Sequence, residues 1–336
     1  MRIKSKPEVP TTMGNDTIIT VTGLTKTFIK EKPWWKTAEP EAFTAVDNLS
    51  FTVGKGEILG ILGANGAGKT TTMQMMLGTM IPTAGTITYF GKDFFTHRSQ
   101  VLQHISFAST YIKMPGDLTV RQNLLIYGGL YGLSKQECEQ ASKYYLEAFG
   151  IAHVLNTEVR FLSAGQITRV MLAKSFLCKP AIVLLDEPTA SLDPESTLDV
   201  RKFILKQRKD HNVTFLITSH DMEEVAALCD RVLVLKEGKL IASDTPTRLA
   251  SSITQANVEL ILESGLEQLK QYAHEQGYLI AHLNHTVSLQ VDEQSIAKLL
   301  RDLTLHGVVY SHISINKPTL EDYFLQVASP KYLKKG

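Results

Sequence analysis

Hydrophobic and polar positions along the chain follow strand-like and helix-like periods in turn. Short apolar clusters bounded by glycines predict strands at Ile18–Val21, Phe43–Val53 and Thr86–Phe90, and residues 119–180 have mainly helical spacing. Alternating elements then follow: strands at Ile182–Leu185 and Thr214–Thr218, a helix at Glu195–Arg208 between them, and a hairpin at Arg231–Asp244. Strands that alternate with helices predict a mainly parallel sheet that helices cover.

The pattern changes after the polar stretch Ser243–Asn257. Apolar positions beyond it predict the order β-α-β-β-α-β between Val258 and Ile315, which is the ferredoxin-like order. A last helix follows Thr319, with Asp322 placed to complete its N-cap. We therefore expect a flexible N-terminus, a first domain, a linker and a small α+β domain, at residues 1–16, 17–245, 246–257 and 258–330.

Composition narrows the class of protein. Of the 336 residues, 43% are hydrophobic and 21% charged, as in soluble globular proteins. A net charge of +1 does not indicate a general nucleic-acid-binding surface, so we expect no nucleic-acid partner. The apolar runs are too short for a membrane helix, and residues 1–16 lack the apolar segment of a secretory signal. Three scattered cysteines favour a reducing compartment, so we expect a cytoplasmic protein.

The strongest chemical signal is GANGAGKT at Gly63–Thr70, which lies between an apolar strand and an amphipathic helix. It matches the phosphate loop G-x-x-x-x-G-K-[ST], in which glycines let backbone N–H groups face the phosphates. Lys69 would reach the β- and γ-phosphate oxygens, and the hydroxyl of Thr70 would bind Mg²⁺. The expected nucleotide contacts are Gly63, Asn65, Gly66, Ala67, Gly68, Lys69, Thr70 and Thr71.

Two acidic residues, a histidine and a second helix N-terminus accompany this loop. A buried strand ends in Asp186, which would hold Mg²⁺ as a Walker B aspartate does, and Glu187, which would orient or deprotonate the attacking water. His220 ends another predicted strand, and beside these motifs we expect it to be functional. LSAGQ at Leu162–Gln166 opens a helix with small residues and a hydroxyl, which is typical of an anion-binding N-terminus.

Together these segments resemble the nucleotide-binding subunits of ATP-binding cassette (ABC) transporters over residues 17–245. The likeness implies an α/β P-loop NTPase with antiparallel β and helical subdomains, which binds ATP and Mg²⁺. LSAGQ is similar to the family signature LSGGQ, with Ala164 in place of the first glycine, and Ser191–Asp193 is similar to the D-loop. Gln166, Ala164 and Asp193 are therefore further expected nucleotide contacts.

The family also implies a head-to-tail dimer, of two copies or with a related subunit, and a separate integral membrane permease. Each ATP would then be shared between the protomers. The partner would contribute Ser163 and Gly165. The first protomer would contribute Lys69, Thr70, Asp186, Glu187 and His220.

Two positions depart from the family pattern or leave it open. Thr110 stands where the glutamine that reaches Mg²⁺ belongs, and our hypothesis is coordination through a water or slower turnover. Phe28 occupies the position of the adenine-stacking aromatic, but an insertion follows it, so that Phe43, Trp34 or Trp35 are alternatives. The paired tryptophans would contact a membrane surface or a partner, or they would anchor a partly buried loop.

The leading hypothesis is an ATPase subunit that energises transport from the cytoplasmic face of the membrane. KPTLEDYFLQ at Lys317–Gln326 resembles the tail of ATPases that drive type-2 ABC exporters, which favours export; a stabilising or dimerising domain is the alternative for this tail. A soluble cassette that acts on ribosomes or DNA is disfavoured, because only 94 residues separate Lys69 from Ser163 and the charge is balanced. Thr110 leaves open an ATP-sensing module with weak hydrolysis.

Overall fold

The computed structural model describes residues 17–30, 41–109, 114–253, 255–284 and 286–328. The chain divides into two compact units, Met1–Thr245 and Pro246–Gly336. The predicted flexible N-terminus, together with Trp34, Trp35 and Thr110, lies outside the described residues. Within the described ranges, no helix is both long and apolar enough to span a membrane.

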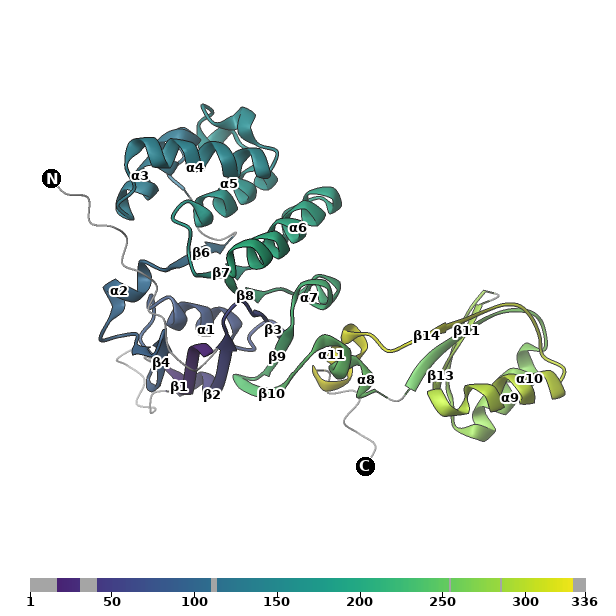
Figure 1. Ribbon diagram of the computed structural model, residues 1–336. Helices are drawn as coiled ribbons and strands as arrows, with labels where there is room; N and C mark the ends of the chain where they lie inside the picture. Colours follow the sequence, from purple (N-terminus) through teal and green to yellow (C-terminus); the bar gives the residue numbers. More distant parts are fainter. Residues whose placement is uncertain (1–16, 31–40, 110–113, 254, 285, 329–336) are drawn as a thin grey trace, which may run out of the picture. The chain divides into compact units, whose positions relative to one another are not determined.

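A six-stranded sheet in the first unit carries most of the predicted motifs (Figure 1). Its order is β10-β9-β3-β8-β7-β6, and all neighbouring strands are parallel except the hairpin pair β9 and β10, which confirms the predicted sheet. Every residue of β3, β7 and β8 is buried, as expected for continuous apolar strands that are covered on both faces. The strands are β3 Ile58–Gly63, β6 Ile105–Ser109, β7 Ile182–Asp186, β8 Thr214–Thr218, β9 Arg231–Lys236 and β10 Lys239–Asp244.

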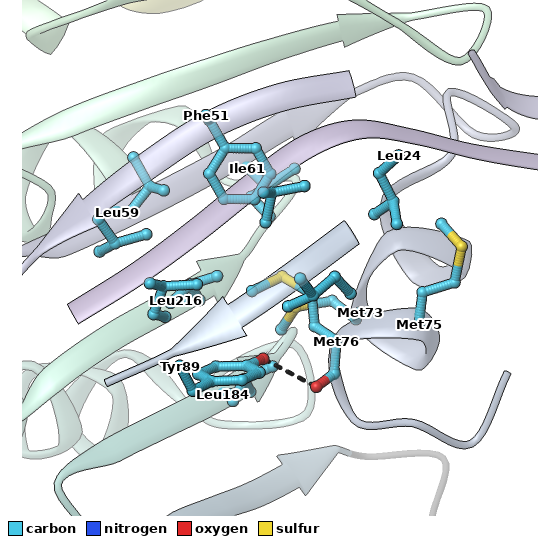
Figure 2. Close-up of a cluster of buried hydrophobic side chains, with 14 of the residues drawn as sticks. Leu24, Phe51, Leu59, Ile61, Met73, Met75, Met76, Tyr89, Leu184 and Leu216 are labelled. Carbon is cyan, nitrogen blue, oxygen red and sulfur yellow. Dashed lines mark hydrogen bonds between the residues drawn. The ribbon is translucent and has the colours of Figure 1, made fainter. Parts of the chain in front are cut away.

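A second, antiparallel sheet and helix α1 (Lys69–Met76) share one hydrophobic core with the first sheet (Figure 2). Met73, Met75 and Met76 of α1 are at most 1% exposed. The buried hydroxyl of Tyr89 donates a hydrogen bond to the carbonyl oxygen of Met76 at 2.8 Å, which fixes the end of α1. The antiparallel sheet has the order β2-β1-β4-β5, with β1 Thr17–Lys30, β2 Glu41–Gly54, β4 Ala84–Tyr89 and β5 Lys92–Asp93.

Helices α3, α4 and α5 pack against one another in the first unit (Figure 1). Each begins at a capping box, in which two residues three positions apart satisfy free N–H groups reciprocally. The pairs are Thr119 with Gln122, Ser134 with Glu137, and Ser163 with Gln166. The helices of the unit beyond α1 are α2 Arg98–Leu102, α3 Val120–Leu130, α4 Lys135–Ala148, α5 Ala164–Phe176, α6 Pro194–His211 and α7 Met222–Leu228, with 3₁₀ turns at Ala152–Val154 and Val159–Phe161.

The second unit contains the predicted β-α-β-β-α-β order, so the ferredoxin-like prediction is confirmed. Its four strands form an antiparallel sheet with the order β12-β13-β11-β14, and alternate residues of β11 enter a core with α9 and α10. Thr319 and Asp322 cap α11 reciprocally, as predicted. The elements are β11 Gln255–Ser264, α9 Leu266–Gln276, β12 Leu279–Leu283, β13 Thr286–Asp292, α10 Ile296–Leu305, β14 Val309–Asn316 and α11 Leu320–Ala328, with a 3₁₀ turn at Glu293–Ser295.

The prediction of a linker at 246–257 is wrong for most of that segment. It contains helix α8 (Pro246–Ser251) and the first residues of β11. Pro246 and Leu249 are buried, and α8 packs against α11 within the second unit. The segment was predicted to be a linker because most of its residues are polar. Two apolar residues three positions apart are nevertheless enough to bury one face of so short a helix.

Candidate active site

The predicted phosphate loop connects β3 to α1. Gly66 and Gly68 have φ angles of +83° and +99°, a region that other residues rarely adopt, and a Cβ on Gly68 would lie 2.5 Å from the carbonyl oxygen of Ala45. Gly68 is also the N-cap of α1 and places no side chain over the N–H groups of the first turn. These N–H groups and the positive end of the helix are therefore available to an anion.

Lys69 is buried within the loop. Its Nζ donates hydrogen bonds to the carbonyl oxygens of Gly63 at 2.6 Å and Ala64 at 3.3 Å. Burial lowers the pKa of Lys69, and the carboxylates of Glu187 and Asp186 oppose this effect. The lysine therefore lies where the phosphate loop and the two predicted acids come together.

Asp186 ends β7 and accepts hydrogen bonds from both neighbouring strands. Oγ1 of Thr218, at the end of β8, donates to one carboxylate oxygen at 2.5 Å, and Oγ of Ser109, at the end of β6, donates to the other at 3.4 Å. Asp186 and Thr70 line one cavity of about 670 Å³. The structure thus brings together two of the three predicted Mg²⁺ ligands, whereas Thr110 lies outside the described residues.

Ser109 and Thr218 are two polar residues of the site that were not predicted from the sequence. Both end buried strands that pair with β7, in register with Asp186. A polar residue at the carboxyl end of a parallel strand is the signal that could have found them, because ligands of such sheets bind at that edge.

Glu187 and His220 are in contact. Nδ1 of His220 lies 3.3 Å from Oε2 of Glu187, and both residues line a second cavity, of about 460 Å³. Glu187 has a φ of +51°, which costs a residue with a Cβ about 1–2 kcal/mol. Its N–H donates to the carbonyl and hydroxyl oxygens of Thr218, which hold this conformation. Backbone strain that neighbours maintain in this way is typical of functional sites.

The predicted signature segment begins α5. Oγ of Ser163 accepts a hydrogen bond from the N–H of Gln166 at 3.2 Å, and Oε1 of Gln166 accepts one from the N–H of Ser163 at 3.0 Å. Ser163 and Ala164 are exposed. Gly165 lies beside the D-loop, where an added Cβ would be 3.6 Å from the carbonyl oxygen of Ser191. The start of α5 is therefore exposed to solvent, while the capping bonds and the neighbouring D-loop hold it in place.

The D-loop, Ser191–Asp193, makes hydrogen bonds to two helices, α5 and α6. The hydroxyls of Thr168, on α5, and Ser191 are 2.7 Å apart, a contact that the sequence pattern did not predict. Asp193, a predicted nucleotide contact, is the N-cap of α6 and accepts hydrogen bonds from the N–H and the hydroxyl of Ser196. These bonds lower the pKa of Asp193, because they stabilise its charged form. The carboxylate therefore has a structural role, as the cap of α6.

Two candidates for adenine stacking, Phe28 and Phe43, lie opposite each other on β1 and β2. Both rings are exposed, and Nζ of Lys26 lies 5.4 Å from the centroid of the Phe28 ring. Strand β2 passes the phosphate loop, since the carbonyl of Ala45 lies against Gly68. Both phenylalanines therefore remain candidates.

The parallel sheet, the glycine-rich loop before α1 and the carboxylate at a neighbouring strand end define a P-loop nucleotide-binding protein. Residues 46–190 match the family described as "ABC transporter". The bacitracin transport ATP-binding protein BcrA of Bacillus licheniformis is 32% identical over 322 residues, which cover 93% of this chain and 97% of that protein. The linearmycin resistance ATP-binding protein LnrL of Bacillus subtilis is 31% identical over 84% of this chain and 93% of its own. The chain therefore belongs to the ATP-binding proteins of ABC transporters.

Solved structures agree at the level of the fold. The dimeric, ADP- and phosphate-bound post-hydrolysis state of the ATP-binding cassette MJ0796 superposes with a TM-score of 0.59 at 22% identity, over 68% of this chain and 98% of that one. Cassettes of this family are ATPases coupled to transport, so the chain is the ATP-binding and ATP-hydrolysing subunit of a transporter. This result favours the leading hypothesis over a cassette that acts on ribosomes or DNA.

Proposed function

We propose that this chain hydrolyses Mg²⁺-bound ATP to energise export through a separate membrane permease, as a peripheral protein on the cytoplasmic face of the membrane. The names of two relatives, which specify bacitracin transport and linearmycin resistance, support export. The tail at Lys317–Gln326, similar to that of ATPases of type-2 exporters, supports the same direction.

Thr70 and Asp186 would hold Mg²⁺, and Thr110, which lies outside the described residues, would be the third ligand. The donor types fit, because Mg²⁺ prefers oxygen ligands and is commonly held by one or two carboxylates together with substrate phosphates. When bound, Mg²⁺ supplies positive charge to the phosphate oxygens. Lys69 adds a second positive charge, and the N–H groups of the loop and of α1 bind the remaining oxygens.

The contact between Glu187 and His220 is the observation that carries the hydrolytic part of the proposal. The Glu187 carboxylate follows Asp186 directly and accepts the proton of the water that attacks the γ-phosphate. His220, 3.3 Å away, keeps that carboxylate in one orientation, and its exposed ring edge is left to contact the γ-phosphate. Glu187 and Asp186 line different cavities, which supports different roles for the two acids.

The site becomes complete when two protomers, either identical or related, meet head to tail across two ATP molecules. Ser163, Ala164, Gly165 and Gln166 of one protomer would then face the γ-phosphate held by the other. Support for this arrangement comes from the exposed start of α5, whose N–H groups and dipole suit an anion. Closure on ATP and reopening after hydrolysis would drive the permease.

Glu187→Gln tests the proposal, because the amide keeps the size of the side chain and loses the proton acceptor. We expect kcat to fall by about 10²-fold or more, while ATP still binds and an ATP-bound dimer accumulates in size-exclusion chromatography. Glu147→Gln, on the exposed face of α4, is the matched control and should change neither quantity. Hydrolysis by Glu187→Gln at the wild-type rate would remove Glu187 from the mechanism.

A further inference from the structure

Glu224, on α7, is a carboxylate with 0% exposure that the proposed mechanism does not use. Oε1 accepts a hydrogen bond from Oγ1 of Thr189 at 2.7 Å, and Oε2 accepts one from Oγ of Ser219, also at 2.7 Å. Both partners are themselves buried. A buried carboxylate is costly unless its oxygens are hydrogen-bonded, so these two bonds account for its presence in the interior.

The two partners come from the two segments that carry the reacting groups. Thr189 follows Glu187 by two residues, and Ser219 directly precedes His220. One carboxylate therefore joins the chain after Glu187 to the chain before His220. The distance of 3.3 Å between Glu187 and His220 depends on how these two segments are held relative to each other.

A second link joins α6 to the segment around His220. NH2 of Arg201, on α6, lies 3.4 Å from Oδ2 of Asp221, the residue after His220. Oδ1 of Asp221 accepts the N–H of Glu224, and the N–H of Asp221 donates to Oγ of Ser219. Arg201 lines the 460 Å³ cavity together with Glu187 and His220. Helix α6, which begins at the D-loop, is in this way connected to the segment around His220.

We propose that Glu224 is a positioning residue for ATP hydrolysis, which sets the contact between Glu187 and His220 by holding Thr189 and Ser219 on its two oxygens. The inference rests on the roles proposed above for Glu187 and His220. Nucleotide affinity depends mainly on the loop around Lys69, to which Glu224 makes no hydrogen bond in the described part of the chain. Loss of Glu224 should therefore reduce turnover and leave ATP binding intact.

The test compares two substitutions of Glu224 in the full-length chain. Glu224→Ala removes both acceptors, and we expect kcat to fall at least about tenfold while the Kd for Mg²⁺-ATP stays within about twofold of the wild type. Glu224→Gln keeps the size of the side chain, and its amide can still bridge the two hydroxyls, each of which can donate or accept. We expect Glu224→Gln to recover kcat to within about threefold of the wild type.

Thr189→Val and Ser219→Ala remove the two donors one at a time. Each should lower kcat, and each should add little further loss in combination with Glu224→Ala, because the partners act as one unit. These variants also carry the test if Glu224→Ala does not fold. Normal turnover in both single variants would overturn the proposal.

Thr214→Val is the matched control. Thr214 is a buried residue at the other end of the strand that precedes Ser219, and its hydroxyl accepts a hydrogen bond from the N–H of Gly56 at 2.8 Å. Its loss should lower stability without changing kcat. Normal kcat in Glu224→Ala, or equal loss of kcat in Glu224→Ala and Thr214→Val, would overturn the inference. The ATPase activity of the wild type and its loss in Glu187→Gln test the proposed function separately.

Discussion

Lys174, on α5, has an ammonium group that is largely withdrawn from water. Its Nζ lies 4.3 Å from the centroid of the Tyr127 ring on α3, so the cation packs against an aromatic ring. Burial lowers the pKa of Lys174 from 10.5 to about 8. The charged form is thus unfavourable in the folded chain, and replacing this lysine by methionine should stabilise the protein.

The magnitude follows from linkage between proton binding and folding. This lowering of the Lys174 pKa corresponds to about 3 kcal/mol of lost stability at pH 7, where the lysine carries its proton in both the folded and the unfolded chain. The cation–π contact with Tyr127 returns about 1–2 kcal/mol at a partly buried position. Lys174→Met should therefore raise the free energy of unfolding at pH 7 by about 1–2 kcal/mol, since the methionine side chain is of similar length and apolar.

The sign of the pH dependence is a sharper test than the magnitude. Between about pH 8 and 10.5 the unfolded chain binds more protons at this lysine, so wild-type stability gains with rising pH. The advantage of Lys174→Met should therefore shrink by up to about 1.4 kcal/mol for each pH unit in this window. Urea unfolding followed by circular dichroism at pH 7.0, 8.5 and 9.5 measures the difference in unfolding free energy between Lys174→Met and the wild type. The contributions of all other titrating groups cancel in this difference.

Lys143→Met, on an exposed position of α4 in the same group of helices, is the control. It should leave the free energy of unfolding within about 0.5 kcal/mol of the wild type at each pH. The reasoning fails if Lys174→Met is less stable than the wild type at pH 7, or if its advantage is the same at pH 7.0 and 9.5.

Two further predictions concern the phosphate loop and the core beneath it. Gly68→Ala should lower the free energy of unfolding by about 2 kcal/mol or more and abolish nucleotide binding, because the φ of Gly68 is +99° and the added Cβ would meet the carbonyl of Ala45. Gly66→Ala is the control: its Cβ would have no atom within 4 Å, so it should lose less stability in urea unfolding. Equal losses would contradict this account. Tyr89→Phe should cost about 1–2 kcal/mol, because the buried carbonyl of Met76 loses its donor, and an unchanged urea midpoint would refute it.

Most of the fold could be predicted because the hydrophobic pattern reports burial directly. Strand β7 is apolar at four of its five positions and β8 at three of five, both strands are buried at every position, and the predicted pair Thr319 with Asp322 marks the start of α11. Helix α8 was missed because it is short and buries only Pro246 and Leu249. A pattern that needs several turns to emerge cannot identify such a helix.

Within the candidate site, the residues that could be predicted are those whose chemistry is tied to one local segment. The phosphate loop is such a case, because its strand, glycines and helix are contiguous. Asp186 and Glu187 could be found in the same way, since they follow a buried strand directly. The structure places Asp186 and Thr70 on one cavity and Glu187 in contact with His220, while their roles remain those proposed above.

Residues that hold the site together could not be predicted, because their partners are set by the order of the strands. Ser109 and Thr218 reach Asp186 only because β6 and β8 flank β7, and periodicity alone does not give that order. Glu224 stands beside Glu223 in a helix of seven residues, where two adjacent acids predict an exposed first turn. The packing of α7 instead buries Glu224 and leaves Glu223 exposed. The hydrogen bonds of Glu224 to hydroxyls from two distant segments therefore form only when the sheet edge is assembled. Substitutions of Glu224 are accordingly the first that should lower turnover without weakening ATP binding.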